Sequence, residues 1–437
     1  MFEMHAERSR AANACKETNH AERARHRVCP WRRCARAGEE RVRPRIAVTR
    51  RMMRGYADPD ATRERLGRHR AIAAAALGRT GLRVGQAGFG CYRVSVRVPA
   101  HAEALAHALA SGINLIDTSA NYADGESEEL IGQATPRLVE AGTLRRDALV
   151  VVSKAGYLQG RNFDLSRTRK RRGQPFPELV EYDEGLEHCI HPEFLDDQLT
   201  RSLARLRLET LDVYLLHNPE YYLAWAAAHD HPPREAHAEY HRRIENAFRH
   251  LETEVARGRI RWYGISSNTF PAPASDARFT CLERVWNIAE SIAPEHHFAV
   301  VQFPMNLLET GAATIANQPS GTTALEFARR KNLGVLINRP LNAFAGNRLV
   351  RLADGVGLAA RRAGEIKAAL AAADPDWAGD APLSRLALRA LRSTSGIACT
   401  LVGMRRIAYV DDIVAELGHP LECRERGASW RALARLL

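Results

Sequence analysis

The sequence predicts an α/β protein built as a (β/α)8 barrel, on three observations. Short apolar runs recur along the chain, and each is followed by a longer amphipathic stretch, the pattern of parallel strands alternating with helices. Most of these runs are rich in Val, Ile and Leu throughout, as strands covered on both faces are. Chemically active side chains stand where several runs end, which is where such a barrel places its catalytic residues.

Eight apolar runs supply the expected strands, and the amphipathic stretches between them supply helices. The strands are Val84–Gly90, Ile113–Asp117, Ala148–Ser153, Leu211–Leu216, Ile260–Ile265, Ala299–Phe303, Gly334–Ile337 and Ala398–Val402. The clearest helices are Glu193–Leu206, Tyr240–Arg257, Thr322–Lys331 and Leu383–Ser393. A Gly-rich turn, Leu77–Leu82, is expected to close the bottom of the barrel. The TIM barrel therefore spans residues 77–420, and residues 421–437 form a C-terminal tail or helix.

Two long insertions follow the third and fourth strands and are expected to shape the substrate pocket, because both emerge on the catalytic face. The first spans about residues 156–192 and the second about residues 219–239. Neither shows an obvious helix, and the basic run at residues 167–172 is interpreted as a solvated lid segment. His188, Cys189 and His191 lie close together, but no second cluster with ligand spacing accompanies them, so no metal is predicted.

The first 70 residues differ in composition and are predicted to form a basic, poorly ordered extension. Residues 1–57 hold fifteen Lys or Arg and six Asp or Glu, a net charge of +9 out of +12 for the whole chain. The spacing of Cys15, Cys29 and Cys34 does not fit a zinc site. One interpretation is that translation starts at Met52 or Met53 and that the extension is not part of the protein. It is at least as good as the interpretation that the extension has a function.

The expected location is the cytoplasm. Acidic residues within the extension argue against a transit peptide, and no apolar segment supports a signal peptide or a membrane span. The five cysteines outside the extension are scattered without framework spacing, which indicates a reducing compartment. Few aromatic residues are interleaved with the basic ones, so nucleic acid is not an expected partner. A small molecule is the expected partner, and the oligomeric state is open.

Four side chains at or just beyond the ends of the second, third and fourth strands form a candidate acid–base group. They are Asp117, Tyr122, Lys154 and His217. A phenol with an ordinary pKa near ~10 is a weak acid at neutral pH. A nearby Lys ammonium favours the phenolate, and a carboxylate can hold that ammonium in place. The group is therefore suited to proton transfer at a substrate oxygen.

Each of these four residues, taken singly, is better explained by a structural role. Asp117 could cap the next helix, and Tyr122 could be a half-buried loop aromatic. Lys154 could extend out of the barrel mouth, and His217 could lie in a turn with its ring satisfied. Their joint occurrence in register with a barrel favours the functional interpretation.

Several motifs, in chain order, resemble those of the aldo-keto reductase family. The segments that carry the resemblance are Gly112–Tyr122, Ser127–Gly132, Gly264–Asn268, Val301–Asn306 and Leu401–Arg406. Lys154 and His217 stand where the family has its remaining catalytic positions. The resemblance covers about residues 77–417, most of the chain. No glycine-rich dinucleotide or nucleotide motif of another fold competes with it.

The resemblance implies an NADP-dependent oxidoreductase that interconverts an aldehyde, ketone or sugar carbonyl with the alcohol. Tyr122 would act as general acid or base, and Lys154, paired with Asp117, would lower the pKa of Tyr122. His217 would hydrogen-bond and orient the substrate oxygen. The motifs look closer to those of sugar- and aldehyde-converting members than to those of steroid reductases.

The resemblance also implies contacts to NADPH, with NADH as the alternative. The expected cofactor set is Gly90, Cys91, Ser266, Asn268, Gln302, Asn338, Arg339, Leu341, Gly403, Arg405, Arg406 and Asp412, and Tyr92 and Tyr157 belong to the substrate pocket. Gln302 would bind the nicotinamide carboxamide; a buried Gln bonded to neighbouring strands is the alternative. Arg405 and Arg406 would contact a 2′-phosphate; a solvated basic pair is a nearly equal alternative.

The end of the seventh strand departs from the family pattern. Many relatives place an aromatic side chain there to stack on the nicotinamide, whereas this chain has Asn338. Arg339 could instead reach the pyrophosphate, because a guanidinium suits bidentate phosphate binding. This departure keeps open a second class, a non-catalytic dinucleotide-binding regulator or sensor on the same barrel. The complete group of four favours the enzyme.

Overall fold

The structure is a computed structural model that describes residues 52–437 except 346–347 and 353–359. Residues 1–51, the greater part of the predicted basic extension, lie outside the described residues. Among the described residues, no helix combines the length and the apolar composition that crossing a bilayer needs. The five cysteines of the described part are all free thiols.

Eight parallel strands close into a barrel, as predicted. In their order around it they are β3 (Ala87–Gly90), β4 (Leu115–Asp117), β5 (Val150–Ala155), β9 (Leu211–His217), β10 (Ile260–Ser266), β11 (Phe298–Pro304), β12 (Gly334–Asn338) and β15 (Cys399–Val402). Each matches a predicted strand within a few residues, except that the first run is divided. Its start forms β2 (Arg83–Gly85), which pairs antiparallel with β1 (Ala74–Ala76) around the predicted turn, η1 (Gly78–Thr80).

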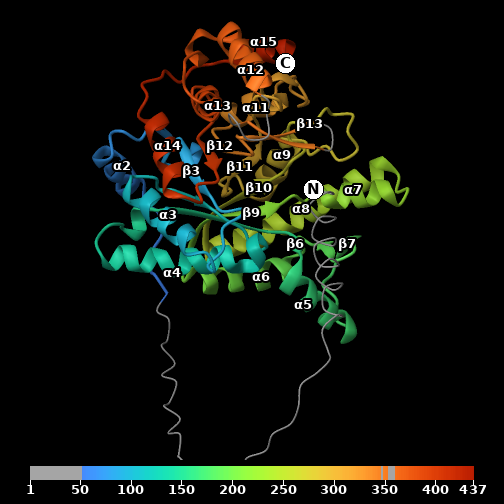
Figure 1. The fold of residues 1–437 in the computed structure, drawn as a ribbon. Coiled ribbons are helices and arrows are strands. Elements are labelled where there is room, and N and C mark those ends of the chain that lie inside the picture. The colour runs from blue at the N-terminus through green and yellow to red at the C-terminus, as the bar shows by residue number, and fades with distance from the viewer. Residues whose placement is uncertain (1–51, 346–347, 353–359) are drawn as a thin grey trace, which may run out of the picture.

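Helices follow the strands and surround the barrel (Figure 1). The main ones are α3 (Pro99–Ala110), α4 (Glu126–Glu140), α6 (Pro192–Leu206), α8 (Pro233–Ala256), α9 (Leu282–Ile292), α11 (Ala324–Arg330), α13 (Leu383–Arg392) and α14 (Ile407–Leu417). Shorter elements are η2 (Tyr122–Gly125), η3 (Arg146–Ala148), α10 (Gly311–Thr314), β13 (Asn342–Ala345), β14 (Arg348–Arg351) and η4 (Pro375–Trp377). Helix α8 begins seven residues before the predicted start, because a proline at its first position suits a helix N-terminus.

Alternation along the strands decides which side chains reach the barrel mouth. Val150 and Val152 of β5 pack inside the barrel, whereas Val151 packs outward against the helices. Because successive side chains of a strand point to opposite faces, Lys154 is on the inner face at the end of β5. The same alternation puts further strand-end residues on the inner face, namely Asp117, His217, Ser266, Gln302 and Asn338.

The prediction that the disordered extension runs to residue 70 is wrong for its last part. Residues 59–68 form helix α2 (Pro59–Arg68), whose N-cap Asp58 accepts hydrogen bonds from two backbone amides of the first turn. Leu66 packs into the core, and the Ala57 amide donates to the buried Asp212 carboxylate at 2.6 Å. The strongly basic composition nearby concealed this amphipathic segment.

The prediction that the two insertions lack helices is also wrong. The first insertion folds as a three-stranded sheet of β6 (Tyr157–Leu158), β8 (Leu186–His188) and β7 (Val180–Asp183), with helix α5 (Gly160–Arg171). Figure 1 shows these elements together on one side of the barrel. The basic run lies within and just after α5, where Lys170 pairs with Glu181 and Glu187. The second insertion holds α7 (Tyr221–Ala228) and the start of α8.

The C-terminal residues form helix α15 (Gly427–Leu436), which packs beside α12 (Ala360–Ala373) (Figure 1). Its attachment is polar as well as apolar. The fully buried Arg426 binds Asp374 and Asp376, and the Trp377 and Trp430 rings pack with centroids 4.9 Å apart. Of the two predicted forms of residues 421–437, a tail or a helix, the structure shows a helix over Gly427–Leu436.

Candidate active site

The Lys154 side chain is fully buried at the end of β5 and donates hydrogen bonds to three groups at the barrel mouth. Its Nζ donates to Asp117 Oδ2 at 2.7 Å and to the Thr118 carbonyl at 2.8 Å. The same nitrogen donates to the Tyr122 hydroxyl at 3.3 Å. An ammonium therefore lies between a buried carboxylate and a phenol, which is the arrangement that proton transfer through the phenol needs.

The second oxygen of Asp117 is held from the opposite side of the barrel. Gln302 Nε2 donates to Asp117 Oδ1 at 2.8 Å, and Gln302 Oε1 accepts from Ser266 Oγ at 3.0 Å. All three side chains are buried. Both ends of the Gln302 amide are thus hydrogen-bonded within the barrel. This is the arrangement expected of a buried Gln bonded to neighbouring strands, the alternative to a nicotinamide contact.

Burial dominates the electrostatics of the group. It raises the pKa of Asp117 and lowers the pKa of Lys154, while their ion pair opposes both shifts. It also raises the pKa of Tyr122 well above its usual value, and the Asp117 carboxylate adds to this rise. The expectation of a lowered Tyr122 pKa is therefore wrong for this structure, because desolvation of the phenolate outweighs the ammonium. The phenol stays protonated at neutral pH.

The His217 imidazole completes the group at the end of β9. Its ring meets the Tyr122 ring edge-on with centroids 5.8 Å apart, and its Nδ1 lies 3.0 Å from Ser119 Oγ. Burial lowers the pKa of His217 well below its usual value, and the charge of Lys154 adds to this effect. The ring is neutral, and with Nδ1 engaged, Nε2 is the nitrogen that remains for a substrate oxygen.

His188, from the first insertion, supports the backbone of His217, the candidate catalytic histidine. Its Nε2 donates to the His217 carbonyl at 2.8 Å, and burial lowers its pKa to about 4, so the ring is a neutral donor. Gly156 leaves room for this contact, since a Cβ there would lie 2.4 Å from the His217 carbonyl oxygen. From the sequence, His188 was expected at most as a metal ligand, and Ser119 was not among the expected site residues.

The backbone is strained directly after three candidate site residues. The φ angle is 47° at Ala123, 52° at Asn218 and 52° at Arg339. For residues other than glycine this left-handed conformation is uncommon, costs of order 1 kcal/mol or more, and clusters at functional sites. These three positions all lie at the mouth of the barrel, where the strands end.

Aromatic rings border the Tyr122–His217 pair, including both predicted pocket residues. Tyr92 is half exposed, and its ring meets the Tyr122 ring edge-on with centroids 5.3 Å apart. Tyr157 is buried, with its centroid 4.7 Å from that of His217, and its hydroxyl accepts from Asn218 Nδ2 at 2.9 Å. A substrate oxygen at His217 would therefore be flanked by ring edges.

The end of β12 holds one polar atom without a partner. Asn338 Oδ1 is buried and has no hydrogen-bond partner among the described residues. The neighbouring Arg339 pairs with Glu309 at 2.9 Å and donates to Asn268 Oδ1 at 3.3 Å. Leu341 is half-buried against the core. An orphaned amide oxygen beside the mouth fits a ligand with an N–H donor, such as a carboxamide.

Positive charge is concentrated beyond β15, around a cavity of about 220 Å³. Its lining residues are Val98, Ala100, His101, Arg405, Arg406 and Tyr409. Burial and the charges of Arg93, Arg351 and Arg406 lower the pKa of Arg405, and no carboxylate of the described residues counteracts this shift. Such a cluster fits a phosphate. Asp412, another residue of the expected cofactor set, pairs with Arg385 at 2.5 Å.

The glycine and cysteine positions of the expected cofactor set differ in their access to solvent. Gly90 pairs with Asp117 at the end of β3, and Gly403 is exposed with open space around it. Cys91 is fully buried in the core, with Sγ 3.7 Å from the Phe89 carbonyl, and burial raises the pKa of its thiol. The expected cofactor contact of Cys91 therefore cannot be made by its side chain, which is directed into the core.

A family model described as "Aldo/keto reductase family" matches residues 82–425. The chain belongs to this family. Solved structures with the same fold include a glycerol dehydrogenase from Gluconobacter oxydans (TM-score 0.53, 20% identity, 84% of this chain and 96% of that one). Another is an aldo/keto reductase from Klebsiella pneumoniae in complex with NADP and acetate (TM-score 0.52, 20% identity, 83% and 96%).

Curated relatives match only part of their own length. An NADH-specific methylglyoxal reductase of Escherichia coli is 32% identical over 24% of this chain and 27% of the relative. A 6-dehydroglucose reductase of Novosphingobium aromaticivorans is 28% identical over 44% and 51%. An NAD(P)H-dependent D-xylose reductase of Scheffersomyces stipitis is 24% identical over 50% and 57%. The chain therefore spans about half or less of these relatives.

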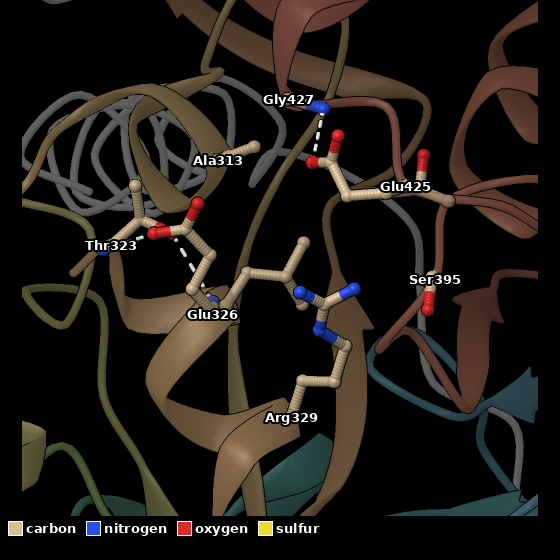
Figure 2. A pocket seen from close by; sticks show the side chains of 9 residues that line it. Ala313, Thr323, Glu326, Arg329, Ser395, Glu425 and Gly427 are labelled. Carbon is tan, nitrogen blue, oxygen red and sulfur yellow. Dashed lines mark hydrogen bonds between the residues drawn. The ribbon is translucent and has the colours of Figure 1, made fainter.

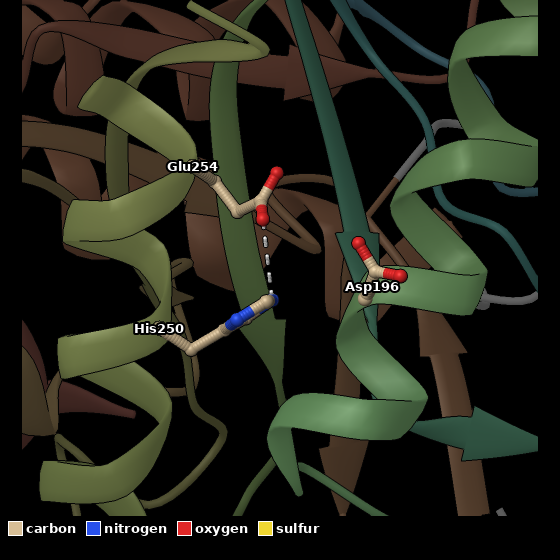
Figure 3. Close-up of side chains that lie close together, drawn as sticks. All are labelled: Asp196, His250 and Glu254. Carbon is tan, nitrogen blue, oxygen red and sulfur yellow. Dashed lines mark ion pairs between the residues drawn. The ribbon is translucent and has the colours of Figure 1, made fainter. Parts of the chain in front are cut away.

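One group of side chains in this aldo/keto reductase has the composition of a metal site. Asp196 of α6 faces His250 and Glu254 of α8, with ligand atoms within 4.8 Å of one another (Figure 3). However, Arg259 pairs with Asp196 at 2.8 Å and with Glu254 at 3.2 Å. Arg257 also pairs with Glu254 at 2.8 Å, so two guanidinium groups face the two carboxylates. The group is therefore better explained as an ion-pair network between two helices.

A second cavity lies in the outer shell of the reductase barrel, between α11 and the start of α15. Figure 2 shows Thr323, Glu326 and Arg329 on one side of it and Glu425 and Gly427 on the other. Its volume of about 10 Å³ has room for roughly one water. None of the candidate catalytic residues lines it.

Proposed function

We propose that the protein is an NAD(P)H-dependent oxidoreductase that reduces an aldehyde, a ketone or a sugar carbonyl to the alcohol. The observation that carries this proposal is the position of Lys154 Nζ, 2.7 Å from Asp117 and 3.3 Å from the Tyr122 hydroxyl. Family membership adds support, because it is consistent with the same residues acting on carbonyl groups.

The residues of the chain divide the work of proton transfer. The chemistry that a reduced nicotinamide would supply here, when bound, is a hydride for the carbonyl carbon. His217 Nε2 hydrogen-bonds the substrate oxygen, and Tyr122 gives its phenolic proton to that oxygen as negative charge develops. The resulting phenolate lies 3.3 Å from the Lys154 ammonium, which stabilises it until solvent restores the proton.

The protonation state of Tyr122 is the one from which carbonyl reduction starts. Burial raises the pKa of Tyr122 well above its usual value, so the phenol carries its proton at neutral pH. Reduction needs a proton donor at this position, whereas alcohol oxidation needs the phenolate. The raised pKa also makes the phenol a weaker acid, so proton transfer depends on Lys154 to stabilise the phenolate.

The cofactor is proposed to lie across the mouth from β10 and β12 to the arginines beyond β15. Ser266, Asn268 and Asn338 would hold the nicotinamide end, where Asn338 Oδ1 lacks a partner among the described residues. Arg405 and Arg406 would bind a phosphate, which favours NADPH. One relative is named as NADH-specific, and one structural neighbour is described as a complex with NADP. The preference of this protein for NADPH or NADH therefore has to be measured.

The test of this function is a titration of the protein with NADPH and with NADH by fluorescence, followed by turnover on a panel of aldehydes and aldoses. Micromolar NADPH binding with turnover supports the oxidoreductase. Binding without turnover on any substrate would favour the sensor. The presence of Asn338 in place of a stacking ring is consistent with that alternative. Absence of binding to either dinucleotide would exclude both.

Arg405→Ala and Arg406→Ala are expected to weaken NADPH binding by about 10- to 100-fold each, because each would remove a charge-assisted hydrogen bond to a phosphate. NADH binding should change by less than about threefold. Both affinities are measured by the same titration. Arg361→Ala, at a side chain that is 92% exposed on α12, is the matched control and should change neither. Equal losses for NADPH and NADH would contradict a 2′-phosphate contact.

A further inference from the structure

Glu220 places a buried carboxyl group between two loops of the barrel mouth. It follows Pro219 at the start of α7, and its side chain is only 4% exposed. Oε1 accepts a hydrogen bond from the backbone N–H of Asn268 at 2.8 Å. Oε2 is buried without a hydrogen-bond partner among the described residues. An unsatisfied carboxyl oxygen is costly inside a protein, so the burial of this side chain needs an explanation.

The two loops joined by Glu220 carry different parts of the proposed site. The loop after β9 begins at His217, and the loop after β10 holds Ser266 and Asn268. They are tied a second time by the Asn218 amide, which donates to the Ser266 carbonyl at 2.7 Å. Of these two hydrogen bonds, only the bond from the Asn268 amide to Glu220 involves a side chain. Substitution and pH can therefore alter this bond directly.

A buried hydroxyl network lies under the β10 loop next to this carboxyl. Ser267 Oγ donates to Thr280 Oγ1 at 3.3 Å, which in turn lies 2.9 Å from the Tyr240 hydroxyl. The amide of Thr269 donates back to Ser267 Oγ at 3.1 Å. Arg339 also donates to the Asn268 side chain. The backbone of the loop is therefore supported on one side by hydroxyl groups and on the other by the Glu220 carboxyl group.

The charge state of Glu220 changes near neutral pH. Burial raises its pKa to about 7, while the Asn268 amide, the Ser267 hydroxyl and the charge of Arg278 oppose the rise. The titratable or charged groups that face it are Tyr221 on its own helix, Tyr157 on β6, Tyr240 on α8 and Arg278 before α9. Of these only Arg278 carries a charge at neutral pH, so Glu220 is the group that titrates.

We propose that Glu220 is a positioning residue that holds the Ser266–Asn268 loop in the conformation that accepts the nicotinamide end of the cofactor, and that its ionisation strengthens this hold. The loop contact stands on the geometry alone, whereas the cofactor part rests on the proposed function. A carboxylate accepts a stronger hydrogen bond than a neutral carboxyl. Cofactor affinity therefore rises as pH increases through about 7.

The first test uses amide hydrogen exchange of the protein without cofactor. In Glu220→Ala the Asn268 amide should exchange about tenfold faster or more, because its acceptor is gone. In Glu220→Gln the amide oxygen still accepts, and protection should persist. Glu326→Gln, at a capping residue of α11, is the matched control and should leave Asn268 unchanged. Unaltered Asn268 exchange in Glu220→Ala would overturn the positioning role whether or not the protein binds a dinucleotide.

The second test measures NADPH dissociation constants from pH 5.5 to 8.5. Wild type should bind about tenfold more tightly at the upper end than at the lower, with a midpoint near 7. Glu220→Gln should lose this component and keep only the pH dependence that ionisation of the 2′-phosphate near pH ~6 brings. An equal pH dependence in Glu220→Gln would overturn the ionisation effect. If wild type binds no dinucleotide, the proposed function fails and the cofactor part of the inference with it, while the exchange result still decides the loop contact.

Discussion

Tyr122→Phe is expected to lower kcat for carbonyl reduction by about 10²- to 10⁴-fold, the usual contribution of a positioned general acid. The phenol is the one hydroxyl that Lys154 contacts in the mouth, and no other described side chain bonded to Lys154 can donate a proton to a substrate. NADPH binding should stay within about twofold of wild type, since the substitution removes one oxygen atom. Steady-state kinetics and fluorescence titration together measure both effects.

Tyr92→Phe is the matched control for this substitution. The Tyr92 ring packs edge-on against Tyr122, but its side chain is half exposed and makes no contact with Lys154 or Asp117 among the hydrogen bonds of the described residues. Its kcat should stay within about threefold of wild type, apart from changes in KM for larger substrates. A loss in Tyr92→Phe as large as that in Tyr122→Phe would contradict the assignment of Tyr122 as the acid.

The sequence alone was enough to predict the barrel and the meeting of its strand ends. Eight apolar runs in βα order predict the strand count, and the period of two in β5 predicts that Lys154 shares the inner face with Val150 and Val152. Because parallel strands end at the same edge, Asp117 and Lys154 had to come close whatever the loops did. This part follows from local patterns and the geometry of the barrel.

Contacts made by inserted or neutral-looking residues could not be predicted in the same way. Ser119 lies 98 residues before His217 in the chain, and His188 reaches the same residue from the three-stranded sheet of the first insertion. Glu220 gave no signal, because an acidic residue after Asn-Pro is usual in a turn. The Tyr122 pKa was predicted in the wrong direction, since desolvation depends on packing that a sequence does not display.

Lys154→Met is expected to abolish turnover and to lower the free energy of unfolding by about 3–5 kcal/mol. Met has a similar length but no charge, so the substitution leaves the Asp117 carboxylate buried with Gln302 Nε2 as its remaining side-chain donor. An unpaired buried charge is strongly destabilising, whereas removing both partners of a buried pair often is not. Chemical denaturation with circular dichroism measures the loss of stability.

Asp117→Asn in the Lys154→Met background separates the two roles of the ion pair. The double variant no longer buries a charge, so most of the lost stability should return, with a coupling energy of about 2 kcal/mol or more between the two sites. Turnover should not return, because the phenolate that forms on Tyr122 after proton transfer would still lack the ammonium 3.3 Å away. Recovery of stability together with activity would show that Lys154 acts only by neutralising Asp117, and it would remove the electrostatic argument for its part in proton transfer.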